Sequence, residues 1–196
     1  STFEIGEFVQ AQAGDLNNMF TADQWRNAYG AHYVPVDPSR GDPDRESTAT
    51  FTIKNVTESG TYDLHLRYAS DEEDNRNVVT NNGNPELTLL VNGSERKLTP
   101  AFTDYWDDWD IHTVSIDLEA GDNTVEIELG SDDVGGLNIN TIGVTEQNSD
   151  PPFPAAYTDF ENTHTEKENY DTEPEFDFIG RVSEPFRLHL QWPQLR

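Results

Sequence analysis

Cysteine is absent from the 196-residue chain, and lysine occurs only at Lys54, Lys97 and Lys167. Without cysteine no disulfide can form, so stability has to come from a hydrophobic core, which a chain of this length can bury. Basic residues number 12 against 38 acidic ones, which gives a formal net charge of -26. Because there is no basic face to meet phosphates, we expect no nucleic acid partner.

Long apolar runs and familiar catalytic motifs are missing as well. No run of 18 apolar residues occurs, so we expect no membrane insertion. The short motifs of serine hydrolases, zinc peptidases and nucleotide-binding loops do not occur. The five histidines lack metal-ligand spacing, and we expect His65 and His112 to face solvent from their strands. We therefore expect that the chain is not an enzyme on its own.

The excess of acidic residues favours a protein that works at high salt over an ordinary acidic secreted protein. So many like charges repel one another at low ionic strength. At about 1 M salt the Debye length falls to roughly 3 Å, which screens this repulsion. We therefore interpret the chain as halophilic, and we expect it to be extracellular or at the cell surface.

Alternation of apolar and polar residues dominates what is present, and it indicates strands with one buried face. The segments that alternate are residues 49–56, 62–68, 86–91, 112–118, 123–129 and 137–144. Turn signals separate them, including Asn92-Gly93, a dipeptide typical of a tight hairpin. The pattern predicts an all-β protein, an antiparallel β-sandwich over residues 1–146. Residues 147–196 form an acidic linker and C-terminal extension that either packs on the sandwich or opens another domain.

Short motifs along these strands follow one another in a recognisable order. They are GTYDLHLRYAS at 60–70, LLVNG at 89–93, YWDDW at 105–109, LEAGDNTVEI at 118–127 and GGLNINTIGV at 135–144. This series resembles the carbohydrate-binding modules of families 6 and 35 over about residues 4–146. The resemblance implies a jelly-roll sandwich, a galactose-binding-like fold, with a sugar site in the loops at one end.

Aromatic residues are the first candidates for sugar binding. An aromatic ring covers the apolar C–H face of a pyranose while polar groups meet its hydroxyls. Trp106 and Trp109 are three residues apart, so both cannot lie on one face of a straight strand. The resemblance assigns the binding loop to the first of them, Trp106, with Tyr105 as an alternate.

Other binding candidates come from the same resemblance. Asn138 matches the asparagine of the family's G-x-N-I-D motif, and a carboxamide can both donate to and accept from sugar hydroxyls. Tyr33 matches an early loop aromatic. Asn75 and Asn77, in a long polar loop, either contact hydroxyls or are merely solvated. Arg67 alternates with apolar neighbours, so we expect an exposed or ion-paired strand arginine.

The resemblance also implies a structural calcium ion near the N-terminal strand. Its ligands in such modules are paired acidic side chains at E-x-E spacing and the aspartate of N-I-D. In this chain the candidate ligands are Glu4 and Glu7, three residues apart, and Asn140 in place of the aspartate. An amide oxygen can ligate calcium but brings no charge. The sequence leaves open whether calcium is bound.

The sequence thus predicts a non-catalytic carbohydrate-binding module. Its partner would be a polysaccharide or oligosaccharide, and its role would be to target a secreted polysaccharide-acting enzyme at high salt. A catalytic domain of the same parent protein would be a second partner. The alternative is a cell-surface or structural β-sandwich without a sugar site, because a fold alone does not define a function.

Overall fold

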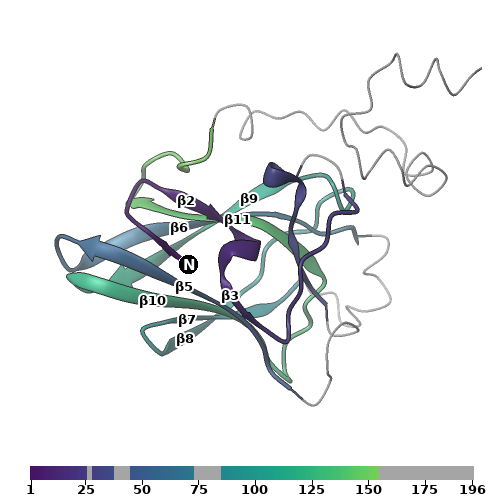
Figure 1. Ribbon diagram of the computed structural model, residues 1–196, viewed down its shortest axis with the longest axis horizontal. Coiled ribbons are helices and arrows are strands. Elements are labelled where there is room, and N and C mark those ends of the chain that lie inside the picture. Colours follow the sequence, from purple (N-terminus) through teal and green to yellow (C-terminus); the bar gives the residue numbers. More distant parts are fainter. Residues whose placement is uncertain (26–27, 38–44, 73–84, 155–196) are drawn as a thin grey trace, which may run out of the picture.

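The computed structural model describes residues 1–25, 28–37, 45–72 and 85–154. Asn75, Asn77 and the extension beyond residue 154 lie outside the described residues, so their expected roles stay predictions. The described chain forms two β-sheets with short connections (Figure 1). None of its helices has the length and apolar character needed to cross a membrane.

The first sheet, sheet A, has six strands. In spatial order they are β1 (Thr2–Phe3), β5 (Ser47–Val56), β10 (Gly121–Leu129), β7 (Leu87–Val91) and β8 (Ser94–Leu98), with β3 (Asp15–Asn17) also paired to β5. All these pairs are antiparallel except β1 with β5. The predicted hairpin between β7 and β8 is confirmed, since Asn92 (φ 50°) and Gly93 (φ 80°) both adopt the left-handed backbone that such a turn requires.

The second sheet, sheet B, has five strands. Its order is β2 (Phe8–Gln10), β11 (Leu137–Glu146), β6 (Gly60–Ala69) and β9 (Asp110–Leu118), and β4 (Val34–Val36) pairs with β11 as well. Because β6 pairs along one edge of β11, β2 and β4 share its other edge. Two short 3-10 helices, η1 (Ala11–Ala13) and η2 (Tyr29–Ala31), complete the described elements.

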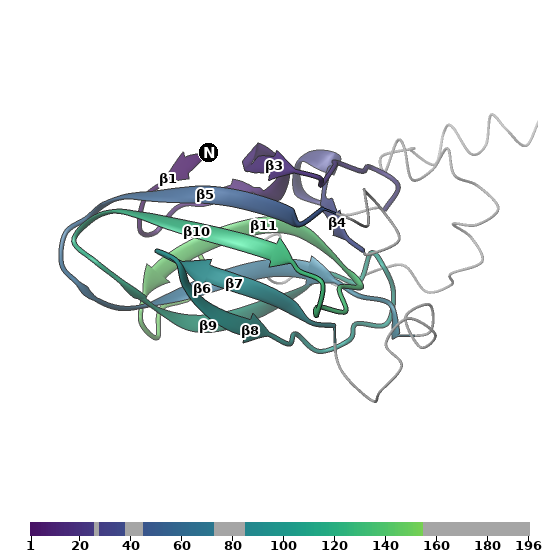
Figure 2. The ribbon, with the colours of Figure 1, turned by 90° about the horizontal axis from the view of Figure 1, so that it is seen from below.

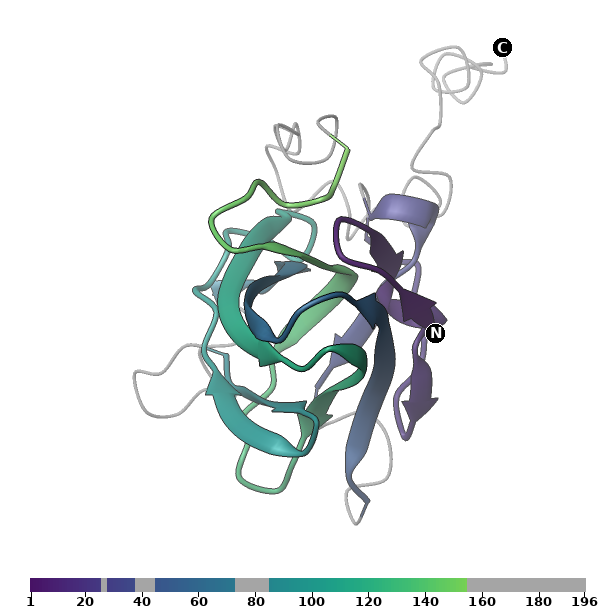
Figure 3. The same cartoon turned by 90° about the vertical axis from the view of Figure 1, so that its left-hand side faces the viewer.

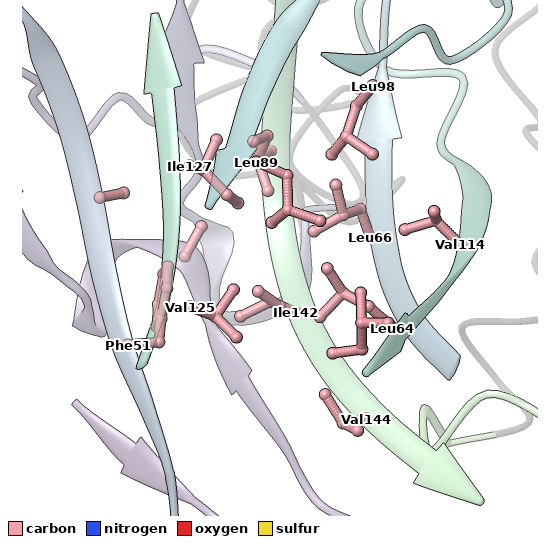
Figure 4. Packing of buried hydrophobic residues seen from close by; sticks show 14 of the residues in the cluster. Phe51, Leu64, Leu66, Leu89, Leu98, Val114, Val125, Ile127, Ile142 and Val144 are labelled. Atoms are coloured by element: carbon pink, nitrogen blue, oxygen red, sulfur yellow. The ribbon is translucent and has the colours of Figure 1, made fainter. Parts of the chain in front are cut away.

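The hydrophobic core lies between the two sheets, which face each other as layers in Figure 2 and curve around a common interior in Figure 3. Side chains of β5 and β10 such as Phe51 and Ile127 meet Leu64, Leu66 and Ile142 of sheet B (Figure 4). These residues come from the alternating segments, because every second side chain of a strand faces the same side. The predicted β-sandwich is confirmed.

The outer face of sheet B is covered in part by the chain that follows β11. Phe153 is 6% exposed, and its ring meets that of Phe8 edge-on with centroids 5.7 Å apart. The backbone N–H of Asn148 donates to Asp63 Oδ2 at 2.8 Å. Residues 147–154 therefore pack on the sandwich, and the two expectations for the whole extension stay predictions.

This covering overturns the expectation that His65 faces solvent. Its side chain is 1% exposed, with Nδ1 2.8 Å from Thr113 Oγ1 and Nε2 2.8 Å from Thr145 Oγ1. Burial lowers the pKa of His65, and the nearby carboxylate of Asp63 only partly opposes this effect. The imidazole is thus held neutral between two hydroxyls.

The lowered pKa predicts a loss of stability in mild acid. The folded chain resists protonating His65, whereas the unfolded chain takes up a proton near the ordinary value of 6.5. The free energy of unfolding should therefore fall as the pH drops from about 7.5 to about 5.5, as measured by urea unfolding. His65→Gln should lose less over this interval, and equal losses in both proteins would contradict this account. The pKa of His112 is also lowered, chiefly by burial, so His112 should still cause some loss of stability in acid in the variant.

Candidate functional site

Strands of sheet B bring most of the candidate residues to one end of the sandwich (right-hand side of Figure 1). There β6 ends, β9 and β11 begin, and β4 lies beside β11. Asn138 pairs with Pro35 on one side and with Ala69 on the other. Because Tyr68 pairs with Asp110, continuing the register places Trp109 opposite Ala69. Asn138 and Trp109 therefore belong to one row across the sheet.

Trp109 is held from two sides on the outer face of sheet B. Its half-buried ring lies over the guanidinium of Arg67, with 5.3 Å from Arg67 Cζ to the ring centroid. The ring of Tyr33 lies 5.7 Å away, tilted by 54°. Cation–π attraction and ring packing both restrict the indole. The pair of contacts makes Trp109 a fixed aromatic group at this end.

Two expectations need correction here. Arg67 was expected to be exposed or ion-paired on its strand. The first alternative is wrong, because Arg67 is 1% exposed and its Nη1 donates to Asn140 Oδ1 at 2.6 Å. Tyr33 was expected to present its ring to a sugar. It is 1% exposed, so its ring supports Trp109 instead of offering a free face.

Tyr105 and Trp106 lie in the loop that precedes β9, and both are half-buried. The loop is tied to the end of β6, because the backbone N–H of Thr103 donates to the Ser70 carbonyl at 2.8 Å. Thr103 Oγ1 lies 2.9 Å from the carbonyl oxygen of Tyr105, to which it donates a hydrogen bond. The loop that carries Trp106 is thus anchored beside the row that contains Trp109.

Asn138 is a buried residue of this row whose carboxamide is unbonded in the described chain. The residue is 5% exposed, and within the described part of the chain its carboxamide forms no hydrogen bond. Its oxygen and its amino group can therefore both serve a ligand. The binding role that the sequence predicts for Asn138 stays a prediction.

Two buried aspartates flank this end and were missed by sequence reasoning. Asp71 is 0% exposed, and so is Asp107 in the Trp106 loop. Buried carboxylates are rare without partners, so they contribute to the order of the loops around them. In a chain with 38 acidic residues, no sequence signal distinguishes these two from the rest.

The three predicted calcium ligands do not fit a calcium site. Glu7 Oε2 accepts the backbone N–H of Glu4 at 2.9 Å, and Glu4 Oε1 accepts from Asn55 Nδ2 at 2.6 Å. Asn140 Oδ1 already accepts from Arg67 and from the backbone N–H of Tyr29. The acids and the amide are engaged separately. Among the described residues, no group of three His, Cys, Asp or Glu side chains is arranged to hold a metal ion.

Comparison of the structure with solved structures decides the fold family. A family 35 carbohydrate-binding module from Paenibacillus barcinonensis matches with a TM-score of 0.57 and 22% identity, over 72% of this chain and 99% of the module. The fold is that of a family 35 carbohydrate-binding module. No protein-family model and no curated protein matches the sequence.

The same fold occurs as a small part of larger enzymes. A Paenibacillus sp. cycloisomaltooligosaccharide glucanotransferase matches with a TM-score of 0.57 and 22% identity over 71% of this chain. The cycloalternan-forming enzyme of Listeria monocytogenes matches with a TM-score of 0.57 and 25% identity over 70% of this chain. This chain covers only 18% and 12% of the lengths of those two proteins.

The buried position of Arg67 predicts that it stabilises the end of sheet B. In Arg67→Met, Asn140 loses a charged donor and Trp109 loses the cation beneath its ring. We expect the free energy of unfolding to fall by about 2–3 kcal/mol in urea unfolding. Arg96→Met is the matched control, since Arg96 is exposed and donates one bond to the Ser115 carbonyl at 2.6 Å. Equal losses in both variants would show that Arg67 has no special structural role.

Proposed function

We propose that this chain is a non-catalytic carbohydrate-binding module whose sugar site lies at the end of sheet B. The observation that carries the proposal is the row in which Trp109, fixed by Arg67 and Tyr33, lies two strands away from the unbonded carboxamide of Asn138. Two strand spacings amount to about 10 Å, a distance that one or two pyranose rings can bridge. An apolar ring face and an amide at this separation suit the two kinds of surface of a sugar.

The matched structures support this function. One is a carbohydrate-binding module in its own right, and two are enzymes whose structures contain cycloisomaltoheptaose or a pentasaccharide substrate. In the proposal, this module belongs to a secreted enzyme that acts on a polysaccharide. It holds that enzyme near its substrate and so raises the local concentration without chemistry of its own.

The second candidate function is a structural or cell-surface interaction domain. The burial of Tyr33, Asp71 and Asp107 favours it, because these residues order the end of the sandwich without needing a ligand. The two candidates differ in one respect, since only a sugar site requires the Asn138 carboxamide to remain unbonded. Binding measurements therefore distinguish them.

Sugar binding is tested by pull-down on insoluble neutral polysaccharides in about 2 M NaCl, followed by calorimetry with soluble fragments. Asn138→Ala should retain the fold, because its side chain forms no hydrogen bond in the described chain, and should weaken binding about tenfold. Trp109→Ala and Trp106→Ala should each weaken binding at least as much. Phe20→Ala is the control, as Phe20 is 42% exposed and lies outside the row. Absence of binding to every glycan would favour the second candidate.

We further propose that the module works at high salt. Most acidic side chains of the described residues are exposed, so their mutual repulsion is screened by salt. Glu128 is an example of a carboxylate that destabilises the folded state. Its pKa is raised by burial first and then by Glu46, Glu126, Asp133 and Glu95. The ionised form is thus disfavoured in the folded state, and at neutral pH this carboxylate lowers stability.

The melting temperature should therefore rise between about 0.1 M and 1 M NaCl as the Debye length shortens. Glu128→Gln should melt a few degrees above the unmodified chain at low salt and should respond less to added NaCl. Asp150→Asn is the control, since it removes one exposed carboxylate. A melting temperature that does not depend on salt would contradict the proposal, whatever the result of the sugar experiments.

A further inference from the structure

Asn140 closes the turn that covers the outer face of sheet B. Its Nδ2 donates to the carbonyl oxygens of Tyr29 (3.0 Å) and His32 (2.7 Å), and its Oδ1 accepts from the Tyr29 N–H (2.9 Å). Arg67 donates to the same oxygen at 2.6 Å. Asn140 is 0% exposed and lies at a register shift of β11 against β6. One carboxamide thus binds the 28–32 segment at three points.

Two further carboxamides lie under the same turn. Gln10 pairs with Thr141, the neighbour of Asn140 in β11, and Gln12 Nε2 donates to Gln10 Oε1. Gly30 (φ 68°) lies directly against the Gln10 carboxamide, so closely that any Cβ at this position would collide with it. Gln10, Gln12 and Asn140 therefore gather between η1, η2 and β11.

These three amides stand where the family resemblance implies a calcium ion. The implied ligands are two acids two residues apart near the N-terminal strand, together with an aspartate in the N-I-D motif. Gln10-Ala11-Gln12 has that spacing, and Asn140 replaces the aspartate, but all three side chains are neutral. The earlier candidates Glu4 and Glu7 lie in the preceding turn, next to Val144.

The chemistry of this arrangement opposes a divalent cation. Calcium takes six to eight oxygen ligands, several of them carboxylates. Here the amino group of Asn140 points at the two carbonyl oxygens that could have served as ligands, and a guanidinium lies beside its oxygen. A cation between these groups would meet the N–H donors of Asn140 and a positive charge, and Gln12 Oε1 is a buried oxygen there that has no hydrogen-bond partner in the described chain.

We propose that the amides of Gln10, Gln12 and Asn140 take the place of the metal ion, so that the fold closes its 28–32 segment without any divalent cation. The N–H groups of Asn140 supply the attraction for the Tyr29 and His32 carbonyls that a cation would otherwise supply. Neutral hydrogen bonds of this kind do not depend on free calcium, and salt screens them little. This inference does not rest on sugar binding.

The first test is thermal unfolding of the unmodified chain in high NaCl with EDTA, with calcium chloride or with magnesium chloride. We expect melting temperatures that agree within about 1 °C, because no ion is gained or lost on folding. If both metals raise the melting temperature equally, and do so in Asn140→Ala as well, the effect comes from the acidic surface and agrees with the proposal. A rise with calcium alone that Asn140→Ala abolishes would overturn it.

The second test exchanges the amides for acids. In EDTA, Asn140→Asp should melt about 5 °C or more below the unmodified chain, because a carboxylate oxygen then faces two carbonyl oxygens. The triple variant Gln10→Glu/Gln12→Glu/Asn140→Asp should regain stability with calcium but not with magnesium. If Asn140→Asp melts at the unmodified temperature in EDTA, or if calcium fails to stabilise the triple variant, the proposal is wrong.

Asn123→Asp serves as the matched control. Asn123 is 1% exposed, and its carboxamide also donates to two backbone carbonyls, those of Glu119 and Gly121. We expect this variant to be destabilised as well, since it too loses amide donors. Calcium should not raise the melting temperature of this variant more than magnesium does. If calcium alone raised it, the response of the triple variant would not be specific to the Asn140 position.

Discussion

The hydrogen bond from Arg67 to Asn140 is the interaction on which the outer face of sheet B depends. It gives one N–H group of a fully buried guanidinium an acceptor, and it fixes the carboxamide that holds the Tyr29 and His32 backbone. The same guanidinium lies beneath Trp109, which in turn contacts Tyr33. Burying polar groups without hydrogen bonds is costly, so loss of this bond would weaken the contacts on both sides of it.

The sandwich could be predicted from the sequence because its determinants are local. The alternation of apolar and polar neighbours is enough to predict that Leu64 and Leu66 face inward. In the same way, the dipeptide Asn92-Gly93 specifies its turn through two positive φ angles. The outer face could not be predicted in the same way. Arg67 and His65 are buried by segments distant in sequence, the Tyr33 region and the chain leading to Phe153, and alternation carries no information about such covering layers.

For the candidate site, the sequence predicted residues but not how they pack. Asn138 has a buried carboxamide that is unbonded in the described chain, while Tyr33, whose backbone pairs with Ala22, is buried against Trp109. The choice between Trp106 and Trp109 depended on strand register, which a single sequence does not contain. The amides Gln10 and Gln12 escaped notice because the paired ligands near the N-terminal strand were sought among acids only.

The closure of the 28–32 segment by amides also concerns how fast the protein can fold. A turn that waits for a metal ion closes in a bimolecular step, at a rate that follows the concentration of the ion. The amide contacts described here are supplied by the chain itself, so their formation is unimolecular and as fast as the pairing of β2 with β11 permits. If the proposal holds, the closure of this segment during folding does not depend on the concentration of a divalent cation.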